Sequence, residues 1–171
     1  MLELLCPRYY VDSIFSIPLA EIKQRGIEGL IFDLDNTLIG WKMEELDAKT
    51  RQWFGELKKM GFRVCLVSNN KKVRVSNFGR ILGVPAISKA RKPRRRAFRE
   101  AMEIMKTGPE TTAVIGDQIF TDILGGNHLG LYTILVAPLS RQEFIGTKCM
   151  RHLERLVLKI LTRRNLLRDK V

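Results

Sequence analysis

Short apolar runs and longer segments of helical periodicity alternate along this chain. The short runs are rich in β-branched and aromatic residues, as buried strands are, and cover residues 28–34, 62–68, 84–87, 111–116 and 131–136. The longer segments predict helices at residues 14–25, 44–60, 71–82 and 93–106. Strands that alternate with helices form βα units. We therefore predict an α/β fold, a three-layer sandwich around a mostly parallel sheet.

The apolar side chains of each predicted helix indicate the face that packs on the sheet. In the helix at 44–60, this face is expected to contain Leu46, Trp53, Phe54 and Leu57. In the helix at 71–82, it is expected to contain Val73, Phe78, Ile81 and Leu82. Pro93 suits the first turn of the next helix, because a proline there loses no helical hydrogen bond.

Two aspartates lie at the end of the first predicted strand. Asp33 and Asp35 are two positions apart, so both side chains would leave the sheet on the same side. Burial of two ionised carboxylates without a partner is costly, and a cation, most simply Mg²⁺, would neutralise them. The structural alternative is that both are solvated in a turn, with Asn36 as the turn residue.

Polar residues also follow the later predicted elements. Ser68 and Asn69 end the second strand, Lys92 opens a basic helix, and Asp117 ends the strand at 111–116, with Asp122 in the segment after it. Each residue has an ordinary structural explanation, namely a helix cap, a solvated surface charge or a turn. Ligands of an open α/β sheet, however, bind outside the carboxyl ends of its strands. The joint order therefore favours one shared site.

This order of motifs resembles the haloacid dehalogenase (HAD) superfamily of aspartate-nucleophile phosphatases, over residues 28–137. Ser68-Asn69-Asn70, and residues 116–122 followed by Gly125-Gly126-Asn127, are similar to the bacterial YqeG-type, class IIIA phosphatases. Residues 7–11 and 26–27 fit that family too, which extends the resemblance over nearly the whole chain. His128 stands where the family favours Arg, and its role stays open.

The resemblance implies a Mg²⁺-dependent phosphomonoester hydrolase that acts through an aspartyl-phosphate. Asp33 would be the nucleophile and a metal ligand. Asp35 would protonate the leaving oxygen and then activate water, and its backbone carbonyl would bind the metal.

The later motifs would hold the phosphate and complete the metal site in such an enzyme. The Ser68 hydroxyl and the Asn69 backbone N–H would bind phosphoryl oxygens, and Lys92 would be a fixed positive charge on the transferring group. Asp117 would be the third protein ligand of Mg²⁺. Asp122 would be a further ligand, or would orient one through water.

Many members of this superfamily carry a cap domain over the site, and this chain has no room for one. Residues 37–44 are too few, and residues 92–111 are filled by a single predicted helix. An uncapped site is open, so we expect it to admit the phosphate end of a bulky substrate such as a lipid, a polymer or another protein.

The composition is that of one soluble globular domain. The chain has 171 residues, of which 45% are hydrophobic and 28% charged. We recognise neither an apolar run long enough to span a membrane nor a secretory signal. Three cysteines without metal-ligand spacing indicate a reducing compartment, so a cytoplasmic location is expected. Cys65, inside a predicted strand, is assigned to the core.

A net charge of +12 suggests an anionic partner. Basic residues cluster at 89–99 and again in the predicted C-terminal helix at 149–171. That helix has an apolar set (Leu153, Leu156, Val157, Ile160 and Leu161) and a basic set (Arg151, Arg155, Lys159 and Arg163). Either it attaches to an anionic membrane surface, or its apolar face packs on the domain. Contact with RNA or the ribosome is a third reading, which no RNA-binding motif supports.

These expectations divide the chain into a lead-in (1–27), a phosphatase core (28–148) and the basic helix (149–171). Because class IIIA relatives include a phosphatidylglycerophosphate phosphatase, the resemblance favours conversion of phosphatidylglycerophosphate to phosphatidylglycerol. A sugar phosphate, a nucleotide and a phosphoprotein remain alternative substrates. A non-catalytic protein associated with RNA or the ribosome is the alternative from another class.

Overall fold

A computed structural model describes residues 2–140 and 145–164, and the side chains of these residues outside 145–152. Six parallel strands form one sheet in the order β1-β6-β5-β2-β3-β4. The strands are β1 (Tyr9–Val11), β2 (Gly29–Phe32), β3 (Arg63–Val67), β4 (Ala86–Ile87), β5 (Thr112–Gly116) and β6 (Tyr132–Val136). The predicted α/β class is confirmed, and the described sheet is wholly parallel.

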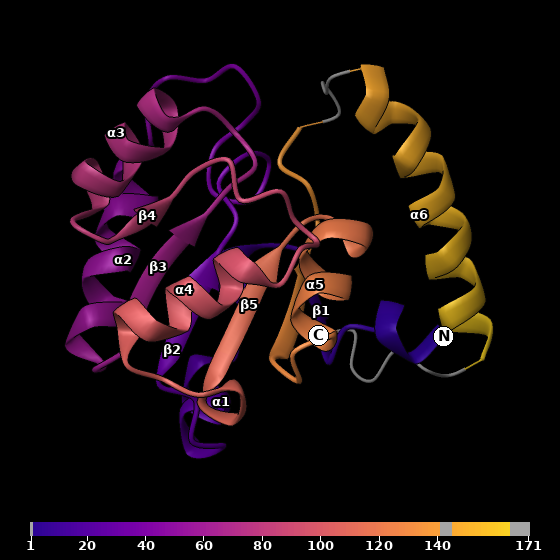
Figure 1. Ribbon diagram of the computed structural model, residues 1–171, viewed down its shortest axis with the longest axis horizontal. Helices are drawn as coiled ribbons and strands as arrows, with labels where there is room; N and C mark the ends of the chain where they lie inside the picture. The colour runs from indigo at the N-terminus through magenta and orange to yellow at the C-terminus, as the bar shows by residue number, and fades with distance from the viewer. Residues whose placement is uncertain (1, 141–144, 165–171) are drawn as a thin grey trace.

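Helices cover both faces of the sheet (Figure 1). They are α1 (Leu19–Gln24), α2 (Ala48–Lys59), α3 (Lys72–Leu82), α4 (Arg96–Met105), α5 (Leu124–Asn127) and α6 (Ile145–Arg163). Alternate residues of β2 face opposite layers. Leu30 and Phe32 pack with α1, α2 and α3, whereas Ile31 packs with α4. The predicted three layers are therefore present.

Shorter turns connect these elements. Three are 3₁₀ turns, η1 (Leu2–Leu5), η2 (Ile14–Ser16) and η3 (Pro109–Thr111), and one is a π-helical turn, η4 (Ile119–Ile123). Helix α6 stands at the end of the molecule away from α2 and α3 (Figure 1). Its buried Val157 and Leu161 pack against Ile119, Ile123 and Leu135.

The N-terminal segment differs from the predicted single helix at 14–25. Pro18 disfavours the helical conformation of the residue before it, and Ile17 is extended, with ψ 127°. The segment is therefore split into η2 and α1. Upstream of it, β1 pairs with β6 at the sheet edge, so the lead-in contributes a strand that the sequence pattern did not predict.

Two expectations about helix positions are wrong. Val73 is 85% exposed and Ile81 is 40% exposed, because the side of α3 that packs on the sheet carries Val75, Phe78 and Leu82. Pro93 lies before α4 and not in its first turn. The intervening residues belong to the loop that carries Lys92 toward the sheet, and Lys92–Pro93 is a cis peptide bond.

The segments where a cap domain would be inserted are short. Residues 33–47 contain only turns and an isolated bridge before α2, which begins at the Asp47 cap. Cys65 is buried in β3, as expected. Among the described helices, none combines the length and the hydropathy needed to cross a bilayer.

Candidate active site

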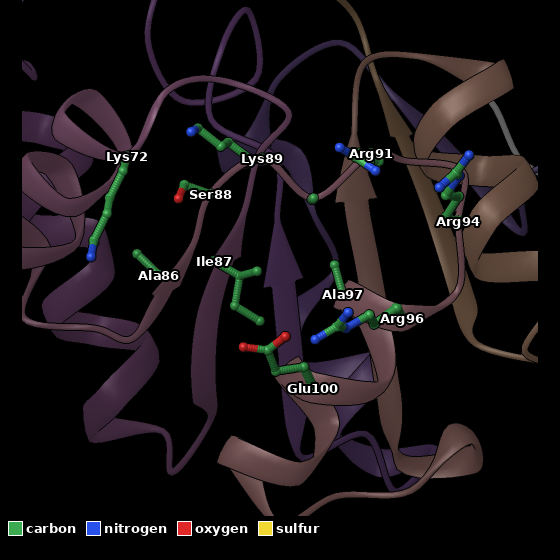
Figure 2. Close-up of a pocket in the computed structure, with 11 residues that line it drawn as sticks. Lys72, Ala86, Ile87, Ser88, Lys89, Arg91, Arg94, Arg96, Ala97 and Glu100 are labelled. Carbon is green, nitrogen blue, oxygen red and sulfur yellow. The ribbon is translucent and has the colours of Figure 1, made fainter.

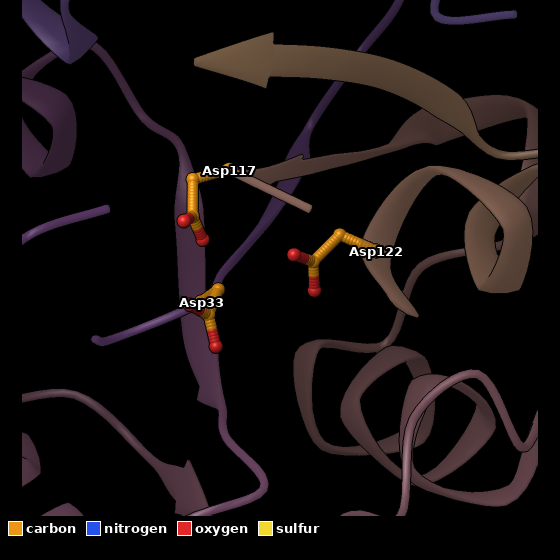
Figure 3. Close-up of side chains that lie close together, drawn as sticks. All are labelled: Asp33, Asp117 and Asp122. Carbon is orange, nitrogen blue, oxygen red and sulfur yellow. The ribbon is translucent and has the colours of Figure 1, made fainter. Parts of the chain in front are cut away.

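The carboxyl ends of neighbouring strands bring three aspartates together. Asp33 follows β2, Asp117 follows β5, and Asp122 lies in η4 just beyond. Because β2 and β5 are adjacent and in parallel register, Asp33 and Asp117 leave the sheet side by side. One oxygen from each of the three carboxylates lies within 4.8 Å of the others, and all three residues are buried (Figure 3). We call this group the aspartate cluster.

The turn after β2 buries Asp33 and does not leave it in solvent. Asn36 adopts a left-handed conformation (φ 64°), which Asn tolerates better than most residues, and its backbone N–H donates to Ile39 O at 2.7 Å. Asn36 is thus a turn residue, but Asp33 beside this turn is only 8% exposed. The alternative of solvated aspartates does not hold for Asp33.

Thr37 links two members of the aspartate cluster. Its hydroxyl oxygen is 3.2 Å from Asp117 Oδ1 and 3.4 Å from Asp33 Oδ2. A hydroxyl has a single proton and can donate to one of these oxygens at a time. The sequence analysis gave Thr37 no role, although it lies only four positions after Asp33.

Lys92 brings a cation into the cluster. Its ammonium lies 2.5 Å from Asp33 Oδ1 and 2.6 Å from Asp122 Oδ1, and the residue is buried. Burial works to lower the Lys92 pKa, but the carboxylates of Asp122 and Asp33 outweigh it and raise that pKa. Burial raises the pKa of Asp33 to about 6, against the opposite effect of Lys92. Lys92 therefore stays charged at neutral pH.

The Asn69 side chain fixes the backbone of Lys92. Lys92 N donates to Asn69 Oδ1 at 2.7 Å, and Asn69 Nδ2 donates to Lys92 O at 3.4 Å. From the sequence, only the backbone N–H of Asn69 was expected to take part, by binding a phosphoryl oxygen. Ser68 is buried beside it, and its hydroxyl oxygen accepts from Asn70 N at 3.1 Å, so the hydroxyl proton can still be donated to a phosphate.

Asp35 is held by two side chains from outside the aspartate cluster. Asn70 Nδ2 donates to Asp35 Oδ2 at 3.0 Å, and Arg74 Nε donates to Asp35 Oδ1 at 2.9 Å. Arg74 also donates from Nη1 to Met43 O at 2.7 Å, whereas its buried Nη2 makes no hydrogen bond within the described part of the chain. Sequence reasoning missed Arg74, because its partner lies 39 positions away.

The position of the Asp122 side chain depends on its close approach to the backbone of Gly116. Its Oδ2 accepts from Gln118 N at 3.2 Å, and its carboxyl carbon lies 2.3 Å from where a Cβ on Gly116 would be. Only glycine leaves this space. The glycine at the end of β5 is thus part of what positions Asp122.

Helix α6 contacts the turn that carries Asp122. Glu154 is buried, and its Oε1 accepts from Ile119 N at 2.7 Å and from Phe120 N at 3.5 Å. These are backbone N–H groups at the start of η4. The sequence analysis missed Glu154, although a lone acid within a basic helix was a usable signal.

The cluster has the donor type and the charge that suit a divalent cation. Three carboxylates lie around a single ammonium, that of Lys92, so acidic groups are in excess among these four side chains. Carboxylate oxygens are the ligands that Mg²⁺ prefers. The residues therefore fit a divalent cation such as Mg²⁺. His128 is exposed at the end of α5 and keeps an open role.

We expect Gly116→Ala to displace Asp122, destabilise the protein by about 1–3 kcal/mol through overpacking, and lower turnover. Urea unfolding and hydrolysis of an aryl phosphate measure both effects. The matched control is Gly55→Ala in α2, where a Cβ meets nothing within 4 Å. It should stabilise the helix by about 0.5–1 kcal/mol. Wild-type stability and turnover in Gly116→Ala would show that Asp122 does not need this space.

Comparison with known proteins points to one family. A family model described as HAD-hydrolase-like matches residues 89–138. A protein named probable phosphatase YqeG, from Bacillus subtilis (strain 168), is 42% identical over 158 residues, which cover 92% of each chain.

Two more distant relatives carry a substrate in their names. Phosphatidylglycerophosphate phosphatase 1, chloroplastic, of Chlamydomonas reinhardtii is 27% identical over 89% of this chain, and the match spans 60% of that protein. The chloroplastic/mitochondrial protein of Arabidopsis thaliana is 27% identical over 94% of this chain, and the match spans 48% of it. This chain thus matches only part of either relative.

A solved structure supports the fold. The cobalt-bound deoxy-D-mannose-octulosonate 8-phosphate phosphatase (YrbI) of Haemophilus influenzae superposes with a TM-score of 0.56 at 16% identity. The superposition covers 80% of this chain and 90% of that chain. At this identity, the likeness concerns the architecture alone.

Proposed function

This chain belongs to the YqeG family and is a HAD-type phosphatase, and we propose that it hydrolyses phosphomonoesters with Mg²⁺ through an aspartyl-phosphate on Asp33. The observation that carries this proposal is the buried Asp33 carboxylate at a strand end, held 2.5 Å from Lys92 and beside two further aspartates. A carboxylate so fixed is suited to in-line attack on a bound phosphate.

Asp33 and Asp35 divide the chemistry. An Asp33 oxygen attacks phosphorus while the bond from phosphorus to the ester oxygen breaks, and that oxygen takes a proton from Asp35. Water then attacks the phosphorus of the aspartyl-phosphate, gives its proton to Asp35, and releases inorganic phosphate from Asp33. Asn70 and Arg74, which donate to Asp35, orient its carboxyl group before substrate binds.

The remaining residues neutralise charge. Lys92 and the Ser68 hydroxyl bind phosphoryl oxygens, and the Asn69 backbone N–H lies in the same turn. The carboxylates of Asp33 and Asp117 and the backbone carbonyl of Asp35 would hold Mg²⁺, with Asp122 as a further ligand or a group that orients one. When bound, Mg²⁺ would neutralise charge on the transferring phosphoryl group.

Phosphatidylglycerophosphate is the proposed substrate. Two relatives are named for that activity, and the short segment at residues 33–47 leaves no cap to exclude a lipid. A sugar phosphate, a nucleotide and a phosphoprotein are the competing substrates. Membership of a phosphatase family argues against the non-catalytic RNA-binding alternative.

A substrate panel tests both levels of this proposal. Purified protein is assayed with Mg²⁺ or with EDTA on short-chain phosphatidylglycerophosphate, glucose 6-phosphate, AMP and a phosphoserine peptide. We expect hydrolysis to require Mg²⁺ and kcat/KM to be highest for the lipid phosphate. Full activity in EDTA would overturn the metal assignment, and a clear preference for a soluble metabolite would overturn the lipid assignment.

We propose that helix α6 binds peripherally to the cytoplasmic face of an anionic membrane. Its inner row, Glu154, Val157 and Leu161, is buried. Leu153 and Leu156 are 47% and 55% exposed, and they lie next to the exposed basic residues Arg155, Lys159 and Arg163. An apolar strip beside a basic strip suits an anionic lipid surface. Packing on the domain and membrane contact thus use different sides of one helix.

Arg151 also belongs to the basic set expected from the sequence, but its side chain is not among those that the structure describes.

We expect Leu153→Gln/Leu156→Gln to weaken sedimentation with phosphatidylglycerol vesicles about 10-fold or more, because each leucine loses apolar burial in lipid. Added salt should release the wild type. Val73→Gln, which removes an exposed apolar residue from α3, is the matched control and should bind as the wild type does. Unchanged sedimentation of the double variant would exclude the membrane role. These point changes are preferable to truncation, which would expose Ile119 and Leu135.

A further inference from the structure

A basic pocket lies at the β4 edge of the sheet (Figure 2). It has a volume of about 630 Å³, and a single acid, Glu100, lies in its lining. Its cations are Lys72, Lys89, Arg91, Arg94 and Arg96. Within the described part of the chain, none of the five forms an ion pair. The pocket therefore has a surplus of positive charge.

The positions of these cations oppose local stability. Lys72 and Arg96 are the first residues of α3 and α4, where the helix dipole disfavours positive charge, and neither first turn contains an acid. Lys89 and Arg91 have left-handed backbones, with φ 50° and 54°. Such conformations persist at functional sites when their surroundings impose them. A bound anion would offset this accumulation of charge.

The pocket is linked to the proposed phosphate site through the chain, because the loop after β4 lines the pocket and leads directly to Lys92. Strand β4 is two strands from β2, or about 10 Å at the usual spacing between strands. The loop after β4 is tied to the residues that follow β3, since Lys89 N donates to Asn70 O at 3.0 Å and Ala90 N donates to Ser68 O at 3.1 Å. Arg91 directly precedes Lys92. Figure 2 shows Lys89 and Arg91 at the same end of the pocket.

We propose that this pocket binds a second phosphate group of the substrate, so that the enzyme selects a phosphomonoester that carries a phosphodiester a few bonds away. The inference rests on the proposed function and specifies it further. In phosphatidylglycerophosphate, a three-carbon glycerol joins the phosphomonoester to the phosphodiester. With the monoester at Asp33, the diester lies toward Lys89 and Arg91.

The test compares binding of two probes by calorimetry with Mg²⁺. One probe is propyl phosphate. The other is propane-1,3-diol with a phosphomonoester at one end and a methyl phosphodiester at the other. The protein carries Asp33→Asn, so that binding is measured without turnover. We expect the two-phosphate probe to bind about 10-fold more tightly than propyl phosphate, and Lys89→Gln/Arg91→Gln to remove this preference. Glutamine is under the same backbone strain as the residues it replaces.

The control is Arg51→Gln/Lys59→Gln, which removes two exposed cations from α2 and should keep the preference. Equal binding of the two probes, or a preference that survives in the pocket variant, overturns the proposal. If Lys89→Gln/Arg91→Gln loses sedimentation with vesicles but keeps the probe preference, the pocket binds lipid headgroups of the membrane surface, and the proposal is overturned. If Asp33→Asn protein with an unchanged pocket prefers the two-phosphate probe, but the wild type does not hydrolyse phosphatidylglycerophosphate, the pocket stands and the lipid substrate is wrong.

Discussion

Asp33→Asn is expected to reduce aryl phosphate turnover on the order of 10⁴-fold or more, since an amide cannot form the aspartyl-phosphate. The metal-free variant should nevertheless be at least as stable as the wild type at neutral pH. Burial raises the pKa of Asp33 to about 6, so its ionised form is disfavoured in the folded protein.

The sign of the pH effect follows from that pKa. The Asp33 pKa is higher in the folded than in the unfolded protein, so the stability that protonated Asp33 contributes is complete below pH 4 and is lost as pH rises through about 6. Asparagine is neutral throughout this range. In EDTA, the advantage of Asp33→Asn should therefore be present at pH 7.5 and absent near pH 4.

Turnover with Mg²⁺, and thermal unfolding in EDTA at both pH values, measure these effects. Glu103→Gln, which neutralises an exposed acid on α4, is the control and should change neither quantity. Retained turnover in Asp33→Asn would exclude Asp33 as the nucleophile. A large loss of stability at pH 7.5 would show that Asp33 is needed for the fold.

Lys92→Met should have the largest effect on stability. It leaves Asp33 and Asp122 buried without their shared cation, and removal of one partner from a buried ion pair destabilises by about 3–5 kcal/mol. For a chain of 171 residues, this corresponds to a fall in Tm of roughly 6–20 °C in EDTA. Mg²⁺ should restore part of the loss, because it supplies the missing positive charge. Turnover should fall about 100-fold or more, since Lys92 no longer neutralises the transferring group.

A double-mutant cycle measures how much the ion pair between Lys92 and Asp122 contributes to the loss of stability in Lys92→Met. Asp122→Asn removes one of the two carboxylates that Lys92 contacts, so the combined variant should be less destabilised than the sum of the single changes. Urea unfolding in EDTA gives the three free energies. Additive effects, or a Lys92→Met variant as stable as the wild type, would contradict the central role of Lys92.

The sequence alone determined most elements, apart from β1 and the division of residues 14–25 into η2 and α1, and the ends of the sheet where the chemistry lies. Leu30, Ile31 and Phe32 are all apolar, which marks a strand buried on both faces, and parallel strands direct their carboxyl ends to one edge. The order of Asp33, Ser68, Lys92 and Asp117 could therefore be assigned to one site before any contact was known. The wrong expectations for Val73 and Pro93 concern local patterns that packing overrides. Val73 lies at helical spacing but faces solvent, and Pro93 belongs to the loop that delivers Lys92.

Only the tertiary structure decided which side chains contact one another. Lys92 bridges Asp33 and Asp122 across 59 and 30 positions of the chain, and Arg74 holds Asp35 across 39. Glu154 reaches η4 from a helix in which the sequence analysis recognised an apolar set and a basic set, but no role for this acid. Local periodicity reports which face of an element is buried. It carries no information on the partner of a buried charge, because the attraction that selects that partner acts through space and is strong only after folding has removed water from the pair.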